Sequence, residues 1–241
     1  MSRGSAALLA VALVSLVIGP AQPTPNRAPR PPAFWPPPVL SRERATAETV
    51  RVDSRGGGVF DTGTGVGVGA HVALTNAHLT SNSVTLVTRC GEQLLAVDRI
   101  ERAVGGADVA VVVTTGRNLL PVELAPDDPV PGDRVLLAGY PDGQFSLTEG
   151  RVEGTLDRPE GRVLRFSPEP TVGQSGSPLL DAEGRLAGLA FARDSSGGQG
   201  LAIPASRLRT LLDEFRARGI PIADAGSGDP ASAAARSPAC P

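Results

Sequence analysis

Three short motifs in this sequence contain the residue types that nucleophilic catalysis requires. His78 ends the run ALTNAH, Asp108 opens the apolar stretch DVAVVV, and Ser175 lies within GQSGSP. A serine hydroxyl is a poor nucleophile until a neighbouring base takes its proton, and histidine is the usual base. A carboxylate then holds the imidazole in the tautomer that can accept the proton. The motifs therefore predict Ser175 as nucleophile, His78 as base and Asp108 as orienting group.

Attack by a serine on a carbonyl creates a negatively charged oxygen, which needs fixed hydrogen-bond donors. The backbone N–H groups of Gly173 and of Ser175 itself are the natural pair. Glycine suits position 173, where the chain must turn sharply to direct its N–H toward the substrate. We therefore expect an oxyanion hole formed by these two N–H groups.

The motifs occur in the order His, Asp, Ser, as in the chymotrypsin-like arrangement and not as in subtilisins or α/β-hydrolases. They resemble the trypsin-like peptidase superfamily and, within it, the bacterial HtrA/Deg branch. That branch has Thr-Asn-x-His, Asp-x-Ala-Val and Gly-Asn-Ser-Gly-Gly-Pro. Here 30 positions separate His78 from Asp108 and 67 separate Asp108 from Ser175. The resemblance covers about residues 58–218 and includes no PDZ module.

The resemblance also implies how a substrate would bind. The segment Phe191-Ala192-Arg193 should pair with an extended peptide by β-addition. Glu169 lies six positions before Ser175, where trypsins have an acidic residue at the base of their specificity pocket. We expect it either to favour a basic residue before the scissile bond or to be an exposed loop glutamate.

Two positions depart from the family motif. Gln174 replaces the Asn or Asp that precedes the serine, so the trypsin-type activation by a new N-terminus is not available in the same form. Ser177 replaces the second glycine, and its hydroxymethyl group is either tolerated or disturbs a closely packed site.

Many short β-branched runs, punctuated by Gly, Pro, Asn or Asp, indicate an all-β fold. Examples are 66–74, 84–88, 109–114, 135–138, 162–166 and 186–192. Together with the resemblance, they predict two antiparallel six-stranded β-barrels packed face to face, over 45–124 and 128–204. The connector is 126–131 (PDDPVP), and the site lies between the barrels. Leucines 208, 211 and 212 and Phe215 recur at helical spacing, which predicts a helix over 205–218.

The regions outside the predicted protease domain (45–219) have different compositions. Residues 1–21 contain a 14-residue apolar run, too short to span a membrane, and therefore read as a signal peptide or, alternatively, an uncleaved anchor. Residues 22–44 form a proline-rich linker. The tail 220–241 consists mainly of small, polar and turn-forming residues, and we expect it to be disordered.

Cysteine occurs only at Cys90 and Cys240. In an oxidising compartment an even number permits a disulfide, which would tie the tail to the domain. The alternative is two free thiols. Neither cysteine has metal-ligand spacing, and the chain has only two histidines, so we expect no metal site.

The net charge of the chain limits the classes of partner that we expect. The formal net charge of −2 gives no reason to expect nucleic acid or an anionic membrane as the partner. The sequence therefore predicts an exported serine endopeptidase that acts on a protein or peptide without a cofactor, with membrane contact only through an uncleaved signal. The alternative is a weak or inactive protease-fold binding protein at the cell envelope. An esterase would favour Gly-x-Ser-x-Gly, but the fifth position here is Ser177.

Overall fold

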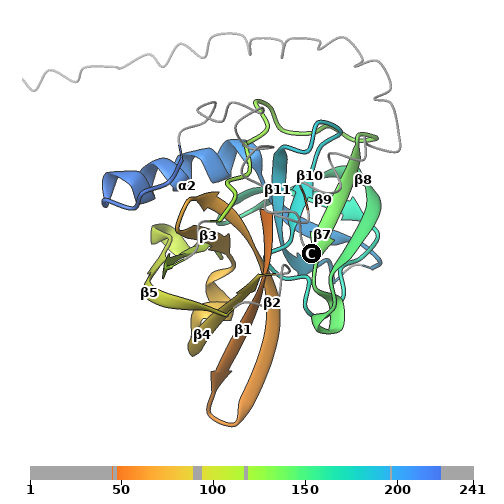
Figure 1. Cartoon of the computed structure of the whole chain (residues 1–241). Coiled ribbons are helices and arrows are strands. Elements are labelled where there is room, and N and C mark those ends of the chain that lie inside the picture. Colours follow the sequence, from red (N-terminus) through yellow and green to blue (C-terminus); the bar gives the residue numbers. More distant parts are fainter. Residues whose placement is uncertain (1–44, 46–47, 89–93, 117–118, 196, 224–241) are drawn as a thin grey trace, which may run out of the picture. The chain divides into compact units, whose positions relative to one another are not determined.

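The computed structural model describes residue 45 and residues 48–88, 94–116, 119–195 and 197–223. Its first half is a closed antiparallel barrel with the strand order β1-β2-β3-β6-β5-β4 (Figure 1). Its strands are β1 (Thr49–Gly56), β2 (Val59–Gly69), β3 (Val72–Thr75), β4 (Ser83–Thr88), β5 (Leu94–Arg102) and β6 (Ala110–Thr115). The run at 66–74 thus forms parts of two strands, which a turn at residues 70–71 separates.

The second half is another closed antiparallel barrel, with the order β10-β11-β12-β9-β8-β7. Its strands are β7 (Arg134–Gly139), β8 (Ser146–Arg158), β9 (Gly161–Ser167), β10 (Pro178–Leu180), β11 (Leu186–Arg193) and β12 (Gly200–Pro204). The predicted fold class of two six-stranded barrels is confirmed.

The C-terminal helix α2 (Ala205–Ala217) follows β12 directly. Its predicted apolar face is buried: Leu208, Leu212 and Phe215 have no exposed surface. Asp128 in the connector accepts hydrogen bonds from the Ser206 N–H at 2.8 Å and the Ser206 hydroxyl at 2.6 Å. This carboxylate satisfies a free N–H of the first helical turn, which is the usual role of a helix cap.

Three apolar clusters hold the molecule together. Two lie within the barrels and are built around Val52 and Leu86 in one and Leu137 and Phe166 in the other. The third joins both barrels to α2. This shared core fixes the barrels against each other, so that residues from both can form one site.

Several predictions fall on residues outside those that the structure describes. They are the signal segment 1–21, the linker 22–44, the tail 220–241 beyond residue 223, and the Cys90–Cys240 pair. Among the described residues, no helix combines the length and the apolar character that crossing a membrane would require.

Candidate active site

His78 and Asp108 are in direct contact. His78 lies in the 3-10 helix η1 (Ala77–Thr80), directly after β3, and Asp108 lies two residues before β6. One carboxylate oxygen of Asp108 lies 2.7 Å from Nδ1 of the His78 ring. The other oxygen accepts a hydrogen bond from the His78 backbone N–H at 2.9 Å. The Asn76 side chain donates to the Asp108 carbonyl at 2.9 Å. The carboxylate therefore contacts His78 at two points, and Asn76 fixes the backbone of Asp108.

Arg102, on β5, holds the other end of η1. Its Nε donates to the Thr80 hydroxyl at 2.9 Å, and its guanidinium also bonds the Thr80 carbonyl. The Thr80 hydroxyl in turn donates to the Ala77 carbonyl at 2.7 Å. Sequence reasoning missed this positioning residue, because nothing local links position 102 to the histidine motif.

Ser175 lies in the turn before β10, and barrel one holds that turn. The Thr64 N–H, on β2, donates to the Ser175 carbonyl at 2.8 Å. Gly176 has φ +81°, and a Cβ there would overlap the Thr64 carbonyl oxygen. The serine can therefore approach β2 only because its neighbour is glycine. Within the described part of the chain, the Ser175 hydroxyl makes no hydrogen bond, including with His78.

The predicted oxyanion donors lie in the same turn. Gly173 has φ +91°, in the left-handed region that favours glycine. Its carbonyl accepts from the Thr64 hydroxyl at 2.8 Å, and that hydroxyl accepts from the Tyr140 N–H at 3.1 Å. The carbonyl is thus tied down, while the N–H groups of Gly173 and Ser175 donate to no described residue. The sequence contains no signal that singles out Thr64, since its contacts span the two barrels.

A cavity of about 230 Å³ brings these groups together between the barrels. We call it the inter-barrel cavity. Its lining is Asp61, Thr62, His78 and Leu79 from barrel one, and residues 170–175 and 191–193 from barrel two. The structure therefore gathers His78, Ser175 and the segment 191–193 around one space. Asp61 and Thr62 were not predicted, because their place depends on how β2 is aligned with η1.

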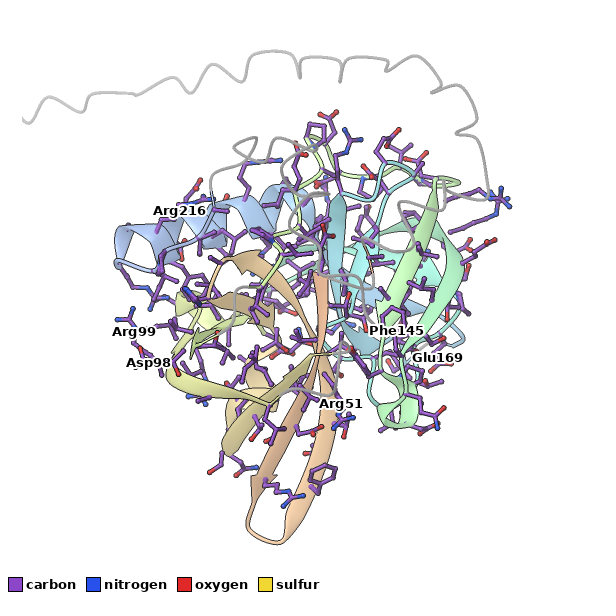
Figure 2. All side chains as sticks on the ribbon, viewed as in Figure 1. Arg51, Asp98, Arg99, Phe145, Glu169 and Arg216 are labelled. Carbon is purple, nitrogen blue, oxygen red and sulfur yellow. The ribbon has the colours of Figure 1, made fainter. Side chains whose placement is uncertain are left out.

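Glu169 does not line the inter-barrel cavity. Its carboxylate lies 3.7 Å from Nε of Arg193, which does line it. Figure 2 shows Glu169 on barrel two. Of the four residues expected to contact substrate, the structure brings Phe191, Ala192 and Arg193 to the cavity and leaves Glu169 outside it.

The two departures from the family motif are accommodated differently. The buried Gln174 side chain accepts hydrogen bonds from the Thr171 N–H at 2.8 Å and the Thr171 hydroxyl at 3.2 Å, which closes the loop before Ser175. Ser177 is fully buried, and its hydroxyl has no hydrogen-bond partner among the described residues. A Cβ at Gly139 would overlap that hydroxyl, so glycine at 139 provides the room for Ser177.

The unpartnered hydroxyl of Ser177 predicts a stabilising substitution. We expect Ser177→Ala to raise the free energy of unfolding by about 1 kcal/mol, because burying an unpaired hydroxyl is unfavourable. For a domain of this size this raises Tm by about 2–4 °C, measurable by circular dichroism. Ser206→Ala is the matched control and should lower Tm, since Ser206 bonds Asp128. A lower Tm for Ser177→Ala would contradict the prediction.

Within the described residues, no group of three or more His, Cys, Asp or Glu side chains is arranged to hold a metal ion.

Comparisons with known proteins identify serine proteases as relatives of this chain. The serine protease Do-like HtrB of Bacillus subtilis is 29% identical over 169 residues, which are 61% of this chain and 36% of that protein. The serine protease Rv3671c of Mycobacterium tuberculosis is 26% identical over 142 residues, 54% of this chain and 35% of its own length. The chain thus spans little more than a third of the length of the curated relatives that it matches.

Solved structures share the fold. The active form of Rv3671c from M. tuberculosis has a TM-score of 0.64 at 24% identity, covering 78% of this chain and 90% of that one. The serine endoprotease from Yersinia pestis has a TM-score of 0.65 at 22% identity, covering 74% and 66%. At these identities the likeness concerns the fold alone.

The family itself is identified by the sequence. The model of the trypsin-like peptidase domain matches residues 63–189, which is more than half of the 241-residue chain and includes all three predicted motifs. This chain therefore belongs to the trypsin-like peptidase family, and its two barrels form a trypsin-like peptidase domain.

Proposed function

We propose that this protein is a serine endopeptidase that cleaves peptide bonds through an acyl-enzyme, with Ser175, His78 and Asp108 as its catalytic residues. The observation that carries the proposal is the double contact of Asp108 with His78, at the ring nitrogen and at the backbone N–H. This contact keeps the proton on Nδ1 and leaves Nε2 free to act as the base.

The reaction then proceeds in two halves. The Ser175 proton passes to His78 Nε2 as Oγ bonds to the substrate carbonyl carbon, whose oxygen takes up negative charge. When the C–N bond breaks, His78 returns that proton to the leaving amine. Water, deprotonated by the same imidazole, then attacks the acyl carbon. The bond between that carbon and Ser175 Oγ breaks, the new carboxyl group leaves, and His78 returns the proton to Oγ. The Asp108 carboxylate stabilises the imidazolium that forms in both halves.

Two further observations support a peptide substrate. The N–H groups of Gly173 and Ser175, which donate to no acceptor in the described residues, can bond the developing oxyanion. In addition, β10 pairs with β11 only as far as Leu189. The segment 191–193 beyond it therefore has an open edge beside the inter-barrel cavity, along which an extended peptide can add as a strand.

A fluorophosphonate probe tests the proposal, because it labels only a serine that a base has activated. We expect the full chain, recovered from outside the cytoplasm, to be labelled at Ser175, and Ser175→Ala to be unlabelled. Ser195→Ala, which changes an exposed loop serine, is the control and should label like wild type. Sequencing the labelled protein from its N-terminus examines export, with a start after Ala21 expected. Failure to label folded wild-type protein would favour a non-catalytic binding protein instead.

A further inference from the structure

The inter-barrel cavity contains one charged group without a partner. Among its lining residues, Asp61, His78 and Arg193 are titratable. His78 contacts Asp108 at 2.7 Å, and Arg193 lies 3.7 Å from Glu169. The exposed side chain of Asp61 has no hydrogen bond or ion pair with any described residue. Its charge is therefore available to a ligand, whereas the other two are at least partly compensated.

The strand geometry explains why Asp61 faces the cavity. Alternate residues of a strand point to the same side, so Asp61 and Gly63 share one face of β2. A Cβ at Gly63 would overlap the side chain of Leu79, which shows that this face of β2 packs against η1. Asp61, two residues before Gly63, is its neighbour on that face and lies outside the contact between Gly63 and Leu79. It therefore borders the cavity beside the helix that presents His78.

The neighbouring charges on β1 do not compensate for Asp61. Asp53 is engaged by Arg51, whose Nε and Nη2 each lie 3.0 Å from its carboxylate. The Thr62 hydroxyl also donates to Asp53, at 3.4 Å. Thr62 points opposite to Asp61 but also lines the cavity, so the Arg51–Asp53 pair adjoins the cavity as two charges that neutralise each other and leaves Asp61 uncompensated. The cavity is thus negatively charged at its barrel-one end.

The proposed reaction determines which part of a substrate lies at the barrel-one end of the inter-barrel cavity. The acyl half of the peptide would pair with segment 191–193 on barrel two, and the leaving amine must reach His78, which protonates it. Residues of the leaving half therefore pass η1 and the adjacent part of β2. We propose that Asp61 is a specificity-determining residue that favours Lys or Arg at the first two positions after the scissile bond. This inference rests on the proposed function.

The expected effect is moderate, because Asp61 is exposed to water. Ion pairs of this kind are weak, so we expect about a fivefold preference in kcat/KM for a basic over a neutral residue, equivalent to about 1 kcal/mol. An acidic residue at the same position should be disfavoured by a similar factor. The preference should shrink as salt is raised from about 0.01 M to 1 M, where the screening length falls to about 3 Å.

The test uses the purified full chain and quenched peptides that carry Lys, Gln or Glu at the first or second position after the cleaved bond. The measured quantity is the ratio of kcat/KM for Lys over Gln peptides. It should be about five for wild type, fall to about one in Asp61→Asn, and drop below one in Asp61→Arg. The control is Asp98→Asn, which removes an exposed carboxylate on β5 that lies far from Glu169 in Figure 2 and does not line the cavity. It should keep the wild-type ratio.

Two results would overturn the inference without affecting the proposed function. One is cleavage of the Lys, Gln and Glu peptides by wild type with equal kcat/KM at both positions. The other is a preference for Lys that Asp61→Asn retains. If wild type cleaves no peptide and Ser175 is not labelled by the fluorophosphonate, the proposed function fails, and the inference fails with it.

Discussion

Replacing Asp108 by Asn is expected to lower kcat by about ten-thousand-fold while leaving the protein folded. The carboxylate accepts hydrogen bonds at both oxygens, from the His78 ring and from the His78 backbone N–H. An amide has only one acceptor oxygen. If that oxygen keeps the backbone contact, the NH2 group faces Nδ1 and forces the ring proton onto Nε2. The imidazole then cannot take the proton of Ser175.

The measurement is the single-turnover rate with a peptide that wild type cleaves, together with the rate of fluorophosphonate labelling. Both should fall in Asp108→Asn, whereas the far-ultraviolet circular dichroism and Tm should change little, because Asn76 still holds the backbone carbonyl at position 108. Asp157→Asn is the matched control. Its carboxylate also forms an ion pair, with Arg162 at 2.9 Å. Both side chains are exposed, so this pair contributes little to stability. A tenfold or smaller loss in Asp108→Asn would contradict the assigned role.

The sequence could predict the elements whose signals are local. The helix α2 has its apolar residues at helical spacing, and all of these side chains are buried. The strands around the three motifs are apolar because they form the barrel cores. In contrast, β8 is 13 residues long and mostly polar, with Gly150 and Gly154 inside it. It is a strand because β7 and β9 both pair with it, which is a tertiary effect that no local propensity reveals.

The same distinction applies to the candidate site. His78, Asp108 and Ser175 lie in recognisable motifs, since the chemistry restricts both their types and their order. For Glu169 the sequence left two interpretations open, because separation from Ser175 along the chain does not determine where a loop side chain points. The contribution of Thr64 depends on the approach of β2 to the serine turn, and that of Arg102 on its contact with η1. Long-range contacts of this kind can be read only from coordinates.

The oxyanion hole provides the second large expected effect, through Gly173→Ala. Position 173 has φ +91°, and a Cβ there would overlap the carbonyl oxygen of Tyr140. Alanine must therefore rotate or displace this peptide, which moves the Gly173 N–H away from the substrate oxygen. Loss of one such donor typically lowers kcat by about 10² to 10³-fold. We expect a decrease in this range, with a smaller change in KM, because the donor acts mainly in the transition state.

The control for Gly173→Ala must separate backbone strain from loss of the donor, and Gly132 offers that separation. Its φ is also +91°, but no atom lies within 4 Å of a Cβ built there, and it does not line the inter-barrel cavity. Alanine at either position is strained at this φ, which should lower the free energy of unfolding by about 1–2 kcal/mol. Gly173→Ala should be destabilised further by its overlap with Tyr140. Only Gly173→Ala should also lose activity in the fully folded protein. If both variants keep full kcat, the Gly173 N–H is not an oxyanion donor. If both lose kcat equally, strain alone accounts for the effect.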